Sequence, residues 1–302
     1  MKTETRPLDW LILATLVVVW GSSFALSKHA LLHLEAAWVM ALRLAVAAAV
    51  LVPYAFAIGQ NLSAPLATWA KFTWLGTVGH AVPFFLITWG MYYVSSGVAG
   101  LLMGAIPLFL VVLAHFTLPD EPLTIPKSIG FLLGFAGIVV LIGPEQILTL
   151  SMTGDELMGE LAVLAGCLCY AVHGVTAKRL GFEHPVKQSA SVCLAAAVMG
   201  LAFAVISHPQ GLVDVPVSAY AAVVGLGLFP TAFATLLTYR LMIRTGPSFV
   251  AYSNYLVPVY AVVLGAIVLN EELGWNIVAA LMLILSGIAI SRITPARTRT
   301  AT

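Results

Sequence analysis

Charged residues are scarce in this chain, and acidic residues are absent from the middle of its apolar segments. Of its 302 residues, 61% are hydrophobic and only 9% are charged, whereas soluble domains average about 45–50% apolar and about 25% charged residues. All thirteen Asp and Glu residues fall in loops, tails or the terminal turn of an apolar run. The composition excludes an ordinary soluble protein, and the placement of the acids argues against a carboxylate relay for protons or sodium ions.

Cysteines are few, and the motifs of several enzyme classes are missing. Cys167, Cys169 and Cys193 all fall in apolar segments and are odd in number, so neither a disulfide framework nor a metal site is implied. The chain contains no G-x-x-x-x-G-K-[ST] run for ATP phosphates, no H-E-x-x-H zinc motif and no pair of membrane aspartates. No Ser–His arrangement at helical spacing is present either. We therefore expect no enzyme, no cofactor and no nucleic-acid partner.

Long apolar runs make up most of the chain. A run of about 20 apolar residues crosses a hydrocarbon core of roughly 30 Å as a helix, and such runs recur along the whole length. The sequence therefore predicts an all-α integral membrane protein with ten transmembrane helices. These fall near residues 10–31, 36–58, 69–94, 97–118, 128–147, 159–180, 187–208, 217–242, 247–269 and 275–293.

The positive charges predict the orientation of these helices. Loops on the cytoplasmic side of a membrane are enriched in Lys and Arg. If the N-terminus is cytoplasmic, only Lys28 and Arg43 of the fourteen Lys and Arg residues do not lie in cytoplasmic segments. We therefore expect both termini in the cytoplasm and the protein in the cytoplasmic (inner) membrane. Lys28 and Arg43, near the outer ends of helices 1 and 2, must pair with partners or extend toward the surface. The two could attract a carboxylate, or they could bond to nearby helix ends.

Prolines occur at matching positions in two halves of the chain. Pro107 and Pro258 are 151 residues apart, and each lies in an apolar helix that ends with acidic residues. Helices 3 and 8 also carry a proline inside the span, Pro83 and Pro230. Because proline removes a backbone hydrogen bond and bends a helix, we expect all four to break or gate their helices.

The matching extends to whole segments. The stretch Val17–Leu31 resembles Gly166–Leu180 at an offset near 150. The sequence thus predicts two five-helix repeats, residues 8–147 and 157–294, followed by a cytoplasmic tail, 295–302. A unit with five spans must enter the membrane in the opposite sense when it is repeated, and inverted repeats typically hold a binding site at the midplane. We therefore expect two inverted repeats around a central cavity.

Counting about 1.5 Å per residue along each helix selects side chains that would meet at the midplane. Most are aromatic or amphipathic, which suits a partly apolar solute held by a few polar groups. His80, His173 and Asn254 should face inward, because an unpartnered polar group in hydrocarbon is costly. The predicted substrate-binding residues are Trp20, Ser23, Phe24, His80, Phe84, Met103, Tyr170, His173, Phe233 and Asn254.

Several motifs resemble those of the drug/metabolite transporter superfamily, and within it the ten-helix EamA-type exporters. The resemblance covers nearly the whole chain and is carried by WGSSFALSK, ALRLAVAA, WGMYYVSSGVAGLLMGAIPLFLVVLAHFTLPDEPLT, IGFLLGFAGIVVLIGP and LVPVYAVVLGAIVLNEEL. It implies two tandem repeats around a central cavity and export of small metabolites, often amino acids or related compounds. The segment HGVTAKR in helix 6 departs from the family pattern, so only its position is carried over.

The favoured hypothesis is a secondary transporter that exports a small polar or amphipathic metabolite by alternating access. A carrier of larger solutes such as nucleotide-sugars is the alternative within transport, but it predicts deep basic residues for a diphosphate, and the deep residues are expected to be neutral or imidazole. A membrane sensor without transport is a third reading. The expected partners are a small-molecule substrate and the lipid bilayer, and the expected state is a monomer or weak homodimer. Proton coupling, through His80 and His173, and uncoupled exchange both stay open.

Overall fold

The computed structural model describes residues 6–118, 123–142, 154–180 and 184–291. Some of the sequence-based expectations fall outside these ranges. They are the tail 295–302, the last residues of the two expected repeats (143–147 and 292–294), and the acidic residues Asp120 and Glu121 that follow the fourth span.

The described residues are helical and contain no strand. Seven helical stretches are long and apolar enough to cross a membrane: Pro7–Ala30, Ala36–Ala57, Ser96–Thr117, Ile125–Ile142, Asp155–Leu180, Pro185–Ser207 and Val217–Thr245. Two more apolar helices, Ser253–Val268 and Trp275–Ser291, are shorter. The protein is therefore an all-helical membrane protein with several spans, as the apolar runs predicted.

Most of the long stretches are single α-helices, and four are interrupted. The uninterrupted ones are α1 (Pro7–Ala30), α2 (Ala36–Ala57), α7 (Ile125–Ile142), α9 (Asp155–Leu180), α10 (Pro185–Ser207) and α15 (Trp275–Ser291). The first interrupted stretch consists of α3 (Leu66–Gly76), the π-helix η1 (Thr77–Ala81) and α4 (Val82–Gly90), and the second of α5 (Ser96–Leu102), the 3₁₀-helix η2 (Met103–Ala105) and α6 (Ile106–Thr117). The third consists of α11 (Val217–Leu226), the π-helix η3 (Gly227–Phe233) and α12 (Ala234–Thr245). The fourth consists of the short helix α13 (Pro247–Val250) and α14 (Ser253–Val268).

Three of the interruptions lie at or just before a matched proline, whereas Pro258 lies inside α14, five residues after that helix begins. The π-helix η1 ends two residues before Pro83, and η3 contains Pro230. Proline cannot donate the regular i→i−4 hydrogen bond, so the turn before it is free to widen. The helix containing Pro107 narrows to a 3₁₀ turn at Met103–Ala105, and the helix containing Pro258 is preceded by a turn at residues 251–252. Each break therefore begins N-terminal to its proline.

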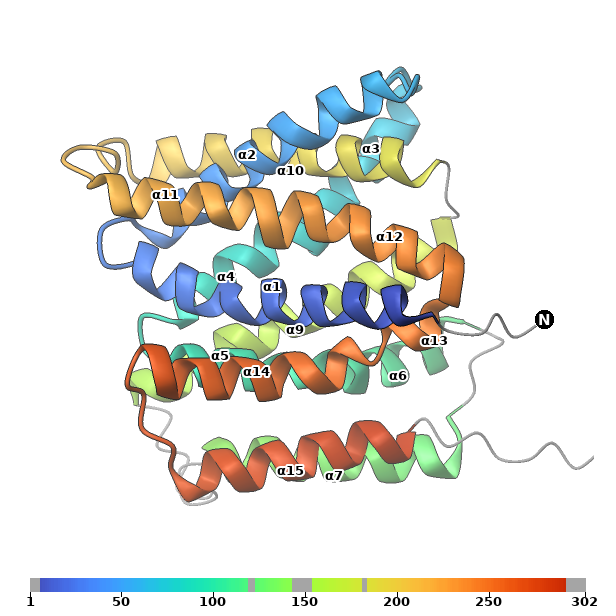
Figure 1. Ribbon diagram of the computed structural model, residues 1–302, viewed down its shortest axis with the longest axis vertical. Helices are drawn as coiled ribbons and strands as arrows, with labels where there is room; N and C mark the ends of the chain where they lie inside the picture. Colours follow the sequence, from blue (N-terminus) through green and yellow to red (C-terminus); the bar gives the residue numbers. More distant parts are fainter. Residues whose placement is uncertain (1–5, 119–122, 143–153, 181–183, 292–302) are drawn as a thin grey trace, which may run out of the picture.

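The helices run side by side across the molecule (Figure 1). The pair α2 and α10 forms one end of the stack, and the pair α7 and α15 forms the other. Between them, α1 packs against α14, α11 and α12, while α9 packs against α4, α5 and α6. The two central helices, α1 and α9, thus pack against the interrupted helices that surround them.

Small residues bring the end pairs close together. The α2–α10 contact is made largely by buried alanines, including Ala41 and Ala47 on α2 and Ala190 and Ala196 on α10. Apolar side chains gain little from leaving lipid for protein, so close backbone approach and dispersion contacts hold such helices together.

The α7–α15 contact depends on glycines. A Cβ atom at Gly130 would lie 2.4 Å from the carbonyl oxygen of Gly287, and a Cβ atom at Gly287 would lie 2.5 Å from the carbonyl oxygen of Gly130. Both distances fall below any van der Waals contact, so a side chain at either position forces the two backbones apart.

Gly287→Ala is therefore expected to destabilise the protein by about 1–3 kcal/mol, as overpacking of a close contact does. The measurement is the apparent melting temperature of the purified protein in detergent. Gly154→Ala is the matched control, because a Cβ atom at Gly154 meets nothing within 4 Å. An unchanged melting temperature for Gly287→Ala would show that α7 and α15 do not pack at this distance.

Candidate solute-binding cavity

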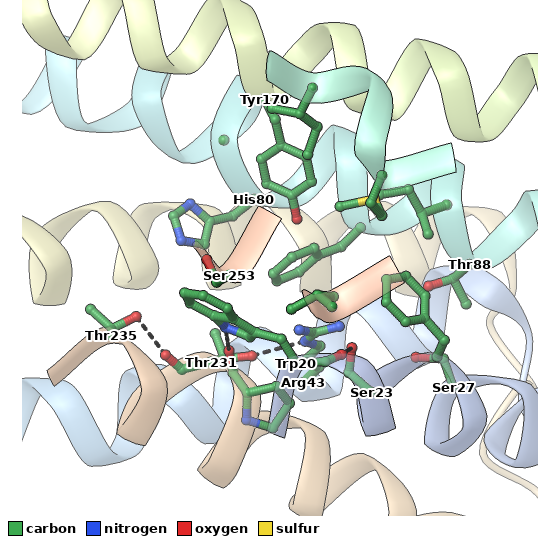
Figure 2. A pocket seen from close by; sticks show the side chains of 18 of the residues that line it. Trp20, Ser23, Ser27, Arg43, His80, Thr88, Tyr170, Thr231, Thr235 and Ser253 are labelled. Carbon is green, nitrogen blue, oxygen red and sulfur yellow. Dashed lines mark hydrogen bonds between the residues drawn. The ribbon is translucent and has the colours of Figure 1, made fainter. Parts of the chain in front are cut away.

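A cavity of about 450 Å³ lies among the interrupted helices. Its walls come from α1, α2, α4, α9 and α14, from the helix breaks at η1, η2 and η3, and from one residue each of α6 and α12. Figure 2 shows the labelled side chains around this cavity. The lining residues are Trp20, Ser23, Phe24, Ser27, Arg43, Gly79, His80, Phe84, Ile87, Thr88, Met91, Met103, Ile106, Tyr170, His173, Pro230, Thr231, Thr235, Ser253, Asn254, Val257 and Pro258.

Aromatic side chains form much of the wall. Phe24 and Phe84 are more than 90% buried, and the Phe84 ring meets the Tyr170 ring edge-on with 6.3 Å between centroids. The indole of Trp20 is fixed by a hydrogen bond of 3.2 Å from its Nε1 to the carbonyl oxygen of Pro230. Edge-to-face contacts between aromatic rings are stabilising and restrict the orientation of both rings. These rings therefore give the cavity an apolar surface of defined shape.

A threonine side chain bonds the backbone of the π-helix η3 next to its proline. Pro230 has no N–H to donate to the carbonyl of Leu226, four residues earlier, and a π-helix pairs backbone groups five residues apart. Thr231 Oγ1 also donates to the Leu226 carbonyl, at 2.8 Å. The same oxygen accepts a hydrogen bond from Arg43 Nε, also at 2.8 Å. Because Thr231 is buried, its hydroxyl links the proline break on η3 directly to the arginine on α2.

Arg43 carries the one permanent charge among the lining residues. Its Cζ lies 3.9 Å from the centroid of the Phe84 ring, a cation–π contact. Its terminal Nη groups form no hydrogen bond with the described part of the chain, and no carboxylate there pairs with it. Figure 2 shows the guanidinium beside Trp20 and Thr231 inside the cavity.

This position corrects the sequence-based view of Arg43. We expected a side chain that pairs at a helix end or extends to the surface, and we expected the deep residues to be neutral or imidazole. The structure turns Arg43 inward because η3 packs against α2 at this level. A Cβ atom at Gly227 would lie 2.8 Å from the Arg43 carbonyl oxygen, so glycine permits the approach that places Thr231 within reach.

Two histidines meet on the other side of the cavity. The rings of His80 and His173 are 6.0 Å apart and nearly perpendicular. His173 Nδ1 lies 3.2 Å from the carbonyl oxygen of Leu75, and since a carbonyl only accepts, this nitrogen carries the proton. Gly79 makes room for it, because a Cβ atom there would overlap the His173 ring.

His80 differs from its neighbour. Its Nδ1 is buried and has no hydrogen-bond partner in the described part of the chain, although we expected a partner on helix 1 or 9 or in the substrate. Its ring packs edge-on against Phe84, with centroids 5.7 Å apart. His80 therefore lines the cavity as a polar ring with unused hydrogen-bonding capacity.

Nine of the ten predicted substrate-binding side chains reach this cavity: Trp20, Ser23, Phe24, His80, Phe84, Met103, Tyr170, His173 and Asn254. The structure does not bring Phe233 to it, and that side chain is 43% exposed. Phe233 ends the π-helix η3, where the widened turn changes the direction of each following side chain. Among the prolines, Pro230 and Pro258 line the cavity, while Pro83 and Pro107 do not.

Sequence reasoning considered a carboxylate at Arg43 but did not count Arg43 among the binding residues, and it missed several hydroxyl residues in the wall. Ser27, Thr88, Thr235 and Ser253 also line the cavity. Small hydroxyl residues in apolar helices were a usable signal, since their depth can be counted from the helix ends. The described residues contain no group of three or more His, Cys, Asp or Glu side chains that could hold a metal ion. The cavity offers noncovalent contacts to a small solute.

Two charged side chains, Lys28 and Glu271, form hydrogen bonds with the backbone between α4 and α5 and at the start of α5. Lys28 Nζ donates to the carbonyl oxygens of Met91 and, at 3.0 Å, Val94, which follow α4. Glu271 accepts from the backbone N–H groups of Ser96 and Gly97 at 2.6 and 2.8 Å, at the start of α5. A carboxylate at a helix N-terminus and a cation at a helix C-terminus both satisfy free backbone groups and oppose the helix dipole.

The all-helical fold with a solute-sized internal cavity defines a multi-pass membrane protein of the transporter class. The chain belongs to the EamA-like transporter family, whose model matches residues 8–143 and 157–293. It is thus a transmembrane transporter, and its relatives are transporters rather than enzymes.

Three similar proteins illustrate the relationship. The "Uncharacterized transporter YoaV" of Bacillus subtilis (strain 168) is 28% identical over 214 residues, which cover 70% of this chain and 72% of the relative. The "Probable terminal-alkyne amino-acid exporter" of Streptantibioticus cattleyicolor is 28% identical over 268 residues, which cover 87% of this chain and 85% of the relative. A solved crystal structure shares the fold with a TM-score of 0.68 at 24% identity, covering 95% of this chain and 98% of that one.

The contacts of Glu271 lead to a prediction about stability. Glu271→Gln keeps the size of the side chain but removes the charge that both N–H groups of α5 face, and we expect a loss of about 1–2 kcal/mol. Glu272→Gln is the matched control, because Glu272 is exposed. The apparent melting temperature of each variant in detergent is the measurement. Equal melting temperatures would contradict the role given to Glu271.

Proposed function

We propose that this transporter exports small amphipathic metabolites, amino acids or related compounds, across the cytoplasmic membrane by alternating access. The observation that carries the proposal is the cavity of about 450 Å³, with its aromatic walls and few polar groups. Such a composition suits a small molecule with one apolar and one polar part. The Streptantibioticus relative, named a probable amino-acid exporter, supports the same class of substrate.

We further propose ten transmembrane helices in two inverted repeats, 8–147 and 157–294. The helix packing supports this arrangement. The main contacts that α1 makes as the first helix of one repeat have counterparts in the main contacts that α9 makes as the first helix of the other. The contact of α1 with α14 corresponds to that of α9 with α5 and α6, and the contact of α1 with α11 and α12 corresponds to that of α9 with α4. The pairs α2–α10 and α7–α15 each map onto themselves.

The paired helix breaks supply places where such a transporter can bend. Both η1 and η3 are π-helical, and they occupy matching positions in the two halves. Breaks of this kind around a central site are typical of inverted-repeat transporters, in which one bundle moves against the other. In this proposal Pro83, Pro107, Pro230 and Pro258 set the bending points.

A carrier of nucleotide-sugars fits the cavity less well. A diphosphate carries two or more negative charges and is typically held by several basic side chains. The lining residues include one arginine and two histidines. This cation set favours a smaller polar group, so the export of small metabolites is the preferred function.

Transport in proteoliposomes tests the function. Export of a labelled metabolite mixture by cells that overexpress the protein would first identify a substrate, and vesicles containing the purified protein should then exchange it faster than empty vesicles. We expect His80→Ala to reduce exchange about tenfold and His80→Gln to retain part of it, because glutamine keeps hydrogen-bonding groups. Parental exchange by His80→Ala between pH 5.5 and 8 would remove His80 from the site. Failure of the parental protein to exchange any solute would refute the function.

The proposed orientation can be checked by labelling. In a variant without Cys167, Cys169 and Cys193, a single cysteine placed at Asp155 should react with an impermeant maleimide added outside intact cells. A cysteine at Lys127 should react only after the membrane is opened. This follows from the placement of Lys and Arg residues in the expected cytoplasmic segments. The reverse labelling pattern would invert the proposed topology.

A further inference from the structure

We propose that Arg43 selects an organic anion, a carboxylate attached to an apolar body, and that the cavity disfavours substrates carrying an ammonium group. This inference rests on the proposed transport function and narrows its substrate class to carboxylates without an ammonium group, so that free amino acids become the disfavoured members of that class. It begins with the charges of the wall. The 22 lining residues include Arg43, His80 and His173, and none of them is an aspartate or glutamate.

The contacts of Arg43 leave most of its charge uncompensated. Its Nε donates to one neutral hydroxyl, and its flat face lies on one ring. A cation–π contact contributes about 0.5–2 kcal/mol, whereas a charge at the centre of a membrane helix costs about 2.5–3.5 kcal/mol or more. One such contact and one hydrogen bond can hold the side chain in place, but they provide no countercharge.

The orientation of the Arg43 guanidinium leaves the edge with its two Nη groups free to bind a solute. Thr231 binds Nε, and Phe84 covers one face. The two Nη groups remain, and they form no hydrogen bond with the described residues. Because they present parallel N–H donors, they match the two oxygens of a carboxylate, a geometry that a neutral group does not reproduce.

An ammonium group finds no comparable partner. The backbone carbonyls that helix breaks usually offer to a cation each already accept one hydrogen bond from the protein, and none of them carries the full negative charge that would compensate an ammonium group. Leu226 accepts from Thr231, Pro230 from Trp20, and Leu75 from His173. A buried ammonium without a counterion is strongly penalised, and here it would also face the positive charge of Arg43.

The apolar part of the solute has a matching surface. Phe24, Phe84 and Ile87 are buried residues of the wall, and the rings of Trp20 and Tyr170 line the same cavity (Figure 2). An aryl or alkyl body placed there would lie against these side chains while its carboxylate meets Arg43.

A series of three probes that share a phenylethyl body tests the charge preference. They are 3-phenylpropanoate, with a carboxylate alone; phenylalanine, with a carboxylate and an ammonium group; and phenethylamine, with an ammonium group alone. Binding is measured as thermal stabilisation of the purified protein in detergent, and transport is measured by exchange in proteoliposomes. We expect 3-phenylpropanoate to stabilise the protein most and phenethylamine least.

Substitutions then assign the preference to Arg43. We expect Arg43→Gln to weaken apparent binding of 3-phenylpropanoate about ten- to hundredfold, the effect of losing a charged hydrogen bond. Arg43→Lys should retain part of the binding because it keeps the charge. Arg240→Gln is the matched control, since Arg240 is an exposed arginine that does not line the cavity, and it should bind like the parent.

The outcomes separate this inference from the transport function. Stabilisation by the carboxylate without exchange of any probe would support the binding site and count against transport. Exchange with phenethylamine or phenylalanine preferred over 3-phenylpropanoate would support transport and overturn the inference. The inference is also wrong if 3-phenylpropanoate gives no stabilisation of the parental protein, a comparison that needs no variant to fold. Equal binding by Arg43→Gln and the parent would likewise overturn it.

Discussion

The organisation of the cavity depends on the two hydrogen bonds of one buried hydroxyl, that of Thr231. Pro230 has no N–H to donate to the carbonyl of Leu226, and the hydroxyl of Thr231, next to it in the π-helix, donates to that carbonyl. The same hydroxyl accepts a hydrogen bond from Arg43 Nε on another helix. Through this hydroxyl the π-helix η3 contacts α2 and holds a charged side chain inside the cavity.

Side chains from neighbouring helices also contact the backbone near the other breaks. Where η1 widens, the carbonyl of Leu75 accepts from His173 on α9, and near η2 the carbonyl of Leu102 lies 3.4 Å from Cys167 Sγ. Backbone groups in a membrane interior must be satisfied within the protein, and these side chains do so from neighbouring helices. At each break the helix departs from α-helical geometry, and a side chain contacts the backbone there.

Close approach of helices makes these connections possible. Gly79 admits the ring of His173, and Gly227 admits the backbone of α2 next to Arg43. In the same way, Gly97 and Gly265 leave space for the Glu271 carboxylate, which a Cβ atom at Gly265 would overlap. Glycine is used at these positions because a neighbouring helix or a charged group occupies the volume that a side chain would fill.

The sequence by itself determined the membrane class, the helical content and which of many side chains share one cavity. A rise of about 1.5 Å per residue groups residues of different helices by level, and Trp20, His80, Tyr170 and Asn254, grouped in this way, line the same cavity. Three of the matched prolines also lie at or just after a helix interruption. These properties are local or periodic, and each can be counted along the chain.

Only the tertiary structure decided the direction in which several side chains point. Successive side chains turn by about 100° in a helix of 3.6 residues per turn, so a widened π turn redirects all that follow it. Phe233, at the end of η3, is exposed and does not reach the cavity. Arg43 was expected at a helix end and instead faces the cavity, because Gly227 and Thr231, almost 200 residues away, provide the space and the hydrogen bond that hold it there. No count along one helix contains that information.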